Sequence, residues 1–211
     1  MNPGVFSFMW LLVIAILFAT GWGARYTKEN PFKVTPVIAL LLAIGFLSTM
    51  EVELENISFN LASLLIAVAM GIYMGTVKKT GGKIHFLSAA ITAGACCFVF
   101  MTMVPHDPAF YLLDESYLYP LVSVVTVYLF SREPLFCLTA SSAGMLLAGL
   151  VHENRLSGAT GVIHFGSSEL MDLITTVVLI SFLFDQFVWA TGYLLTKLNR
   201  GQEGNLEGDP T

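Results

Sequence analysis

The sequence predicts an all-α, polytopic membrane protein that forms a bundle of about seven transmembrane helices. Three observations predict this fold class. Charged residues make up 12% of the 211 residues and hydrophobic residues 55%, whereas a soluble domain is about one-quarter charged and uses that polar surface to face water. Apolar stretches recur along the chain at lengths near the roughly 17 to 25 residues that cross a bilayer as a helix. Lysine and arginine are distributed unevenly over the segments that connect these stretches.

The predicted helices follow the apolar stretches in order. They span residues 3–23, 34–50, 57–77, 84–104, 113–130, 135–151 and 170–195. The second helix is short, and Pro36 fits its first turn, where the missing N–H costs little. We expect residues 1–200 to form one transmembrane domain. A Gly-rich, polar cytoplasmic tail at residues 201–211 is expected to be disordered.

The region 117–151 allows two interpretations. Arg132, Glu133 and Pro134 divide it into two stretches, of which the first is short for a transmembrane helix. The stretches form either two crossing helices or a re-entrant hairpin that enters and leaves on one side of the membrane. Because an Arg–Glu pair placed inside the bilayer would be expensive, we favour two crossings.

The connecting segments predict the orientation in the membrane. With the N-terminus outside, nine of the ten Lys and Arg residues fall in cytoplasmic segments and one falls outside. Positive residues favour the cytoplasmic side, so we predict an outer N-terminus, a cytoplasmic C-terminus and location in the cell membrane. The nine are Arg25, Lys28, Lys33, Lys78, Lys79, Lys83, Arg132, Lys197 and Arg200, and the one is Arg155.

Small residues recur four positions apart on several predicted helices, which lets helix backbones approach closely. We interpret these stripes as packing within the bundle, with contacts to other membrane proteins as the alternative. The stripes are Ala15, Ala19 and Gly23; Ala67, Gly71 and Gly75; Ala89, Ala93 and Cys97; and Ala140, Gly144 and Ala148. The lipid bilayer is the expected partner. We expect no nucleic acid, because the basic residues are scattered, and no cofactor.

Asp185 is the residue that most strongly suggests a functional role. It lies about ten residues from the inner end of the last predicted helix, which is roughly 15 Å deep at 1.5 Å per residue. A carboxylate at that depth costs several kcal/mol unless it is paired, hydrated or protonated, and such residues often bind protons or substrates. The alternative, which we favour, is a structural hydrogen bond to a hydroxyl of the bundle, to Gln186 or to water.

Histidines and carboxylates gather in two of the predicted outer loops, at His106–Asp107, His152–Glu153 and His164. Such groups bind zinc, and zinc can activate water for hydrolysis. The spacing matches no ligand motif, because Leu156 stands where HExxH has its second histidine. We therefore expect solvated loop residues, with a metal site at His106, His152 and His164 as the alternative.

As a whole, the chain resembles the YphA-like group of small polytopic proteins from spore-forming Gram-positive bacteria. The resemblance rests on the size of the chain, on the Asn2-Pro3-Gly4 lead-in to the first helix and on the run of seven short-looped helices. It implies a role in building the spore or cell envelope rather than a defined catalytic activity. No functional residue carries over.

Three function classes follow from these patterns. The first hypothesis is a non-enzymatic membrane scaffold or assembly factor, which fits the short loops and the lack of catalytic motifs. The second is a small proton-coupled transporter that uses Asp185. The third is an outward-facing, metal-dependent hydrolase that uses the histidines.

Overall fold

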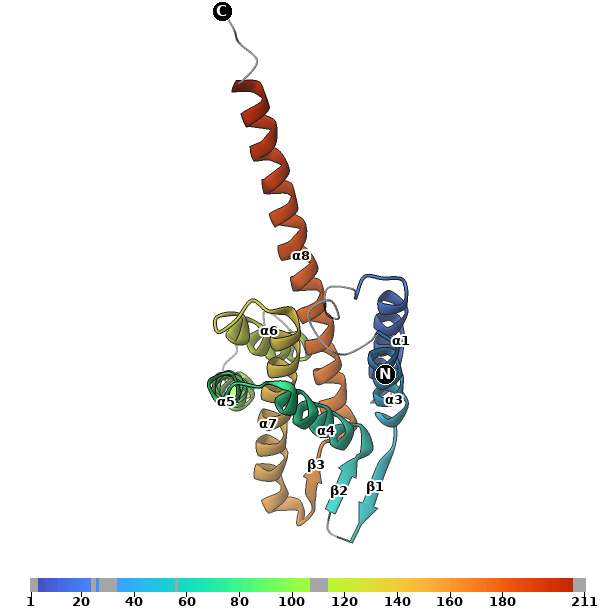
Figure 1. Ribbon diagram of the computed structural model, residues 1–211. Helices are drawn as coiled ribbons and strands as arrows, with labels where there is room; N and C mark the ends of the chain where they lie inside the picture. Colours follow the sequence, from blue (N-terminus) through green and yellow to red (C-terminus); the bar gives the residue numbers. More distant parts are fainter. Residues whose placement is uncertain (1–3, 24–25, 27–33, 56, 107–113, 207–211) are drawn as a thin grey trace, which may run out of the picture.

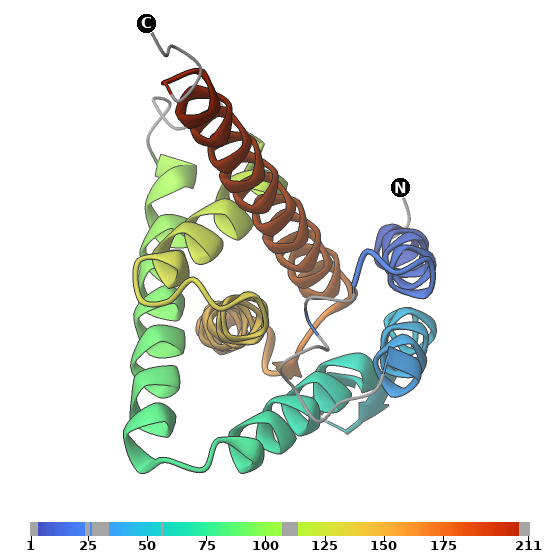
Figure 2. The same ribbon diagram turned by 45° about the horizontal axis from the view of Figure 1, so that its top comes forward.

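The computed structural model describes residues 4–23, 26, 34–55, 57–106 and 114–206. Within these ranges the chain forms seven α-helices, one short 3-10 helix and three short strands (Figures 1 and 2). The helices are α1 (Val5–Ala19), α3 (Val34–Leu47), α4 (Leu61–Thr76), α5 (Thr80–Met103), η1 (Val104–His106), α6 (Glu115–Tyr128), α7 (Pro134–Thr160) and α8 (Ser168–Leu206). The strands are β1 (Glu51–Leu54), β2 (Ile57–Asn60) and β3 (Ile163–Phe165). The predicted bundle of about seven helices is confirmed.

Three helical segments in the described chain are long and apolar enough to cross a membrane, namely Thr80–His106, Pro134–Arg155 and Ser168–Leu194. Helices α1, α3 and α4 are apolar but shorter, at 14 to 16 residues. Helix α8 has 39 residues, which is roughly 58 Å at 1.5 Å per residue. Its C-terminal half therefore extends beyond the other helices (Figure 1).

The structure corrects the predicted start of the third helix. Residues 57–60 form β2, which pairs antiparallel with β1 and parallel with β3. Helix α4 begins at Leu61, because the side chain of Asn60 caps it by accepting a hydrogen bond from the Ala62 N–H at 2.9 Å. Asn60 also donates from Nδ2 to the Ser48 carbonyl oxygen at 2.9 Å, which joins the ends of α3 and α4.

The other predicted boundaries shift at the helix ends. Helix α7 continues to Thr160 rather than ending at residue 151. Helix α8 continues to Leu206, so residues 201–206 are helical where a disordered tail was predicted; residues 207–211 lie outside the described residues. Helices α6 and α7 are separate, and Arg132 and Glu133 between them are exposed. The choice between two crossings and a re-entrant hairpin stays a prediction.

Small residues carry the packing of α5 against α7. A Cβ atom added to Gly144 would lie 2.8 Å from the Ala93 Cβ and 3.0 Å from the Ala90 carbonyl oxygen. The stripes on these two helices are buried, so their predicted role in packing within the bundle is confirmed. On α4, by contrast, a Cβ added to Gly71 or Gly75 would meet no described atom within 4 Å.

Candidate functional site

One end of the helical body collects most of the side-chain hydrogen bonds that join distant parts of the described chain. The three strands lie at this end (Figure 1), which we call the hairpin end. Here α3 leads into β1, β2 leads into α4, and β3 connects α7 to α8. The hydrogen bonds described next also bring the first residues of α1 to this end.

Asp172 on α8 caps the N-terminus of α1. Its carboxylate accepts hydrogen bonds from the Gly4 N–H at 3.2 Å, the Ser7 N–H at 3.0 Å and the Ser7 hydroxyl at 2.5 Å. Helix α1 needs this acceptor because its own N-cap is Gly4, which has no side chain. Gly4 has a φ of 86° and lies against the Ser48 carbonyl. The carboxylate also faces the positive end of the α1 dipole.

Glu153 and Glu51 hold the N-terminus of α8 in a similar way. The Glu153 carboxylate accepts hydrogen bonds from the Gly166 N–H at 3.2 Å, the Ser167 N–H at 3.1 Å and the Ser167 hydroxyl at 2.6 Å. The Glu51 carboxylate accepts from the N–H and hydroxyl of Ser168, at 2.8 and 2.6 Å. Glu153, which the sequence groups with the histidines of the predicted outer loops, and Glu51 are therefore engaged in holding helix ends.

A cavity of about 490 Å³ lies at the hairpin end between α6, α7, β3 and the start of α8. His152, His164 and the carboxylates of Glu115 and Glu169 line it together with Glu153. The Nδ1 atom of His152 is buried and makes no hydrogen bond to the described residues. The cavity therefore offers two imidazoles and two carboxylates that the helix caps do not use.

The predicted metal ligands are only partly brought together. His152 and His164 line the same cavity, whereas His106 is exposed at the end of η1 and does not line it. Asp107 lies outside the described residues. In the part of the chain that the structure describes, no group of three His, Cys, Asp or Glu residues is placed to hold a metal ion.

Asp185 is buried in α8, with 3% of its surface exposed. On the neighbouring helix α7, the hydroxyls of Thr139 and Ser142 donate to the carbonyl oxygens of Leu135 and Leu138, at 2.7 and 2.8 Å. Asp185 lines neither the hairpin-end cavity nor the two apolar cavities described below.

The sequence did not reveal that Asp172 acts as a helix cap. Asp172 and Gly4 are 168 residues apart, and no local motif joins them. The available signal was indirect: an acidic residue lies near the start of the last apolar stretch, and a glycine begins the first one. Both features concern helix N-termini, which need acceptors for their free N–H groups.

The chain belongs to the family of YphA-like integral membrane proteins, whose family model matches residues 4–207. The match covers nearly the whole chain and agrees with the multi-pass architecture and with contact to a lipid bilayer. No match was found among the curated proteins or the solved structures.

Proposed function

We propose that this member of the YphA-like integral membrane proteins is a non-enzymatic assembly factor that holds a partner protein at its hairpin end. The observation that carries the proposal is the free edge of the three-stranded sheet. In the strand order β1-β2-β3, β1 has a described strand neighbour on one side only, and β3 at the other edge packs against α7. An edge strand with unpaired N–H and C=O groups binds extended segments of other chains.

The register indicates which backbone groups of β1 face outward. Leu54 pairs with Ile57 across a two-residue connection, and Glu53 pairs with Ser58. Two-residue hairpin turns place a hydrogen bond between their flanking residues, and hydrogen-bonded pairs alternate along an antiparallel ladder. The N–H and C=O of Glu53 therefore point away from β2, toward the free edge.

The charge of the edge specifies the partner. Glu53 and Glu55 are exposed, and the sequence from Glu51 to Asn60 contains no Lys or Arg. Glu51 is already engaged with Ser168, so Glu53 supplies the free negative charge on the strand itself. The proposed partner is a basic, extended segment of another protein. Its Lys or Arg side chains would lie beside Glu53 and Glu55.

The helix caps favour an assembly role over the two alternatives. The hydrolase hypothesis needs His106, His152 and His164 together at one metal ion, and His106 does not line the cavity that His152 and His164 share. A carrier needs a path to its binding residue, and Asp185 lines none of the three cavities described here. The same caps join the ends of α1, α3, α4 and α8 and so hold the sheet against the helical body.

The predicted orientation places the hairpin end outside the cell membrane, which supports a role in assembling the cell or spore envelope. Topology reporters test this placement. A reporter inserted at Glu55 is expected to be active only outside, and one fused after Lys197 only in the cytoplasm. The opposite pattern would move the proposed partner to the cytoplasm and remove the envelope role.

A peptide-binding measurement tests the edge directly. The protein is reconstituted in nanodiscs of zwitterionic lipid and titrated with a labelled peptide of alternating lysine and valine, followed by fluorescence anisotropy. We expect saturable binding that weakens with salt. Glu53→Pro is expected to reduce it strongly, because proline removes the outward N–H and leaves the β1–β2 ladder intact.

Two controls separate backbone pairing from charge. Glu53→Gln keeps the N–H and loses the charge, so it should weaken binding less than Glu53→Pro. Glu115→Gln changes the net charge equally at the hairpin end, but away from the sheet, and should bind like the unmodified protein. Equal binding to the unmodified protein and to Glu53→Pro, or equal binding of an alternating glutamate–valine peptide, would overturn the proposal.

A further inference from the structure

A cavity of about 360 Å³ separates the α3–α4 pair from α7 and α8 within the helical body. We call it the α3–α4 groove. Leu40 of α3 and Ala69 of α4 form one side, and Leu138 and Ser142 of α7 and Ile174 of α8 form the other. Its volume lies within the roughly 300 to 1,000 Å³ that small-molecule pockets occupy.

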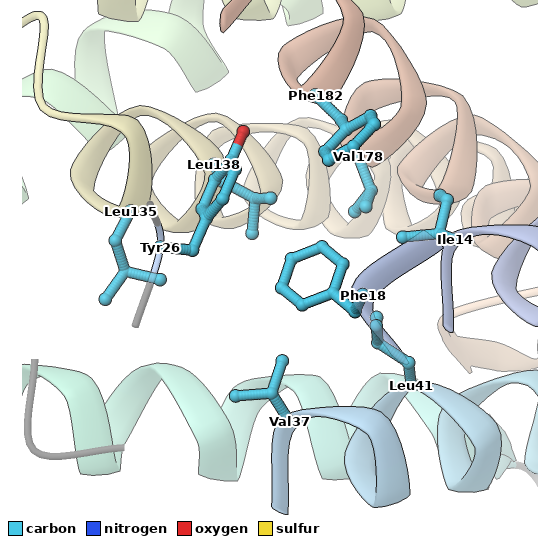
Figure 3. A pocket seen from close by; sticks show the side chains of 9 residues that line it. All are labelled: Ile14, Phe18, Tyr26, Val37, Leu41, Leu135, Leu138, Val178 and Phe182. Atoms are coloured by element: carbon cyan, nitrogen blue, oxygen red, sulfur yellow. The ribbon is translucent and has the colours of Figure 1, made fainter. Parts of the chain in front are cut away.

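A second, smaller cavity of about 70 Å³ continues the groove toward α1. The two cavities share five lining residues, Val37, Leu41, Leu135, Leu138 and Val178. Figure 3 shows the side chains of the smaller cavity converging from α1, α3, α7 and α8, with the ring of Phe18 among them. Together the two cavities form a narrow apolar space inside the bundle.

Most side chains that line the groove are apolar, and its polar side-chain groups are the hydroxyls of Tyr73, Thr139, Ser142 and Thr175. Two of the hydroxyls that line it, those of Thr139 and Ser142, already donate to carbonyl oxygens of α7 at 2.7 and 2.8 Å. A trapped water needs two to four polar partners, and apolar cavities stay dry. Protein interiors contain few voids larger than a water molecule. An apolar chain therefore fits the groove better than solvent does.

The position of the groove indicates which apolar molecule occupies it. Val68 and Ile72 of α4 line the groove, and about half of each side chain remains exposed at the protein surface. In an integral membrane protein that surface faces the acyl chains of the bilayer. We infer that the α3–α4 groove is a lipid site, which binds an acyl chain of a bilayer phospholipid between the α3–α4 pair and helices α7 and α8.

Photolabelling tests the site. The protein is reconstituted with a phosphatidylcholine that carries a diazirine in one acyl chain, irradiated, digested and analysed by mass spectrometry. Ser142 and Ile174 are buried behind α4, so lipid that only surrounds the protein cannot reach them. We expect adducts on the α7 and α8 peptides that contain these residues. We also expect labelling to depend on the carbon position of the diazirine, because a bound chain has a fixed depth.

A filling variant and its control complete the test. Ala69→Phe places a ring in the groove and should reduce labelling of Ser142 and Ile174 several-fold. Ala95→Phe makes the same change at an exposed position on α5 that does not line the groove, and should leave the labelling unchanged. Adducts confined to exposed residues such as Leu64 would overturn the inference. So would labelling of Ser142 that is independent of diazirine depth, a measurement that needs no variant.

Discussion

Replacing Gly144 by alanine gives a sharp test of the α5–α7 crossing. The added Cβ would lie 2.8 Å from the Ala93 Cβ, 3.0 Å from the Ala90 carbonyl oxygen and 3.0 Å from the Gly94 nitrogen. Nonbonded carbon atoms prefer about 3.5 to 4.0 Å, so the helices must separate by roughly 1 Å. The neighbouring atoms belong to the backbone or to a Cβ, and no side-chain rotation can relieve the contact.

A comparison with a matched control variant gives the size of the expected loss of stability. Gly71→Ala makes the same chemical change on α4, where the added Cβ meets no described atom within 4 Å. Both variants gain the same helix propensity, up to about 1 kcal/mol for alanine over glycine, so the difference between them isolates the steric cost. Overpacking costs about 1 to 3 kcal/mol. At about 2 to 4 °C per kcal/mol for a chain of this size, Gly144→Ala should unfold about 2 to 12 °C below Gly71→Ala.

The cysteines of the protein provide the assay. Cys97 and Cys137 are buried, with 0% and 1% of their surfaces exposed. In a Cys96→Ser background, which removes the partly exposed third thiol, a thiol-reactive fluorogenic dye therefore reports unfolding of detergent-purified protein during heating. Cys97 lies three residues after Gly94, which packs against Gly144, and its thiol donates to the Tyr119 carbonyl oxygen of α6, so early dye reaction would also report local opening around α5. A Gly144→Ala variant that unfolds at or above the temperature of Gly71→Ala would refute the proposed close contact.

Three further predictions use the same unfolding assay or a simple binding measurement. Asp172→Ala leaves three donors at the start of α1 without their acceptor, which costs about 1 to 3 kcal/mol for each buried donor. This variant should lower the unfolding temperature far more than Glu169→Ala, which changes an exposed residue near Asp172 on α8. Purified protein should retain no stoichiometric zinc; one equivalent of metal that is lost in His152→Ala and His164→Ala would contradict this. Asp185→Asn should fold and function nearly normally, whereas Asp185→Leu should lose about 1 to 3 kcal/mol of stability. An Asn variant that is expressed normally but shows a complete loss of phenotype would favour the proton-coupled transporter hypothesis.

The sequence predicted the helices and their close contacts because both depend on local patterns. Each helix follows an apolar stretch of suitable length, and the stripes on α5 and α7 repeat at the spacing of one helix face. Gly144 and Ala93, which meet at this crossing, were predicted in this sense, because small residues at every fourth position indicate close helix packing. The sequence did not indicate which helix packs against which stripe, because several helices carry such stripes.

The hairpin end depends on contacts between distant residues, which explains why the sequence did not reveal it. Residues 57–60 are followed directly by the apolar residues of α4, so composition alone extends the helix to residue 57. Strand β2 forms because β1 pairs with one of its edges and β3 with the other, and β3 lies more than 100 residues away in the sequence. The caps formed by Asp172 and Glu51 also span more than 100 residues.

The caps also bear on how Asp185 should be interpreted. An acidic residue in a membrane-spanning helix is functional by default, yet Asp172, on the same helix, is explained by the helix N-terminus that it meets. Asp185 is buried in α8, with 3% of its surface exposed, and it lines none of the three cavities described above. This position favours the structural interpretation of Asp185 over a carrier, and the Asp185→Asn and Asp185→Leu variants distinguish the two.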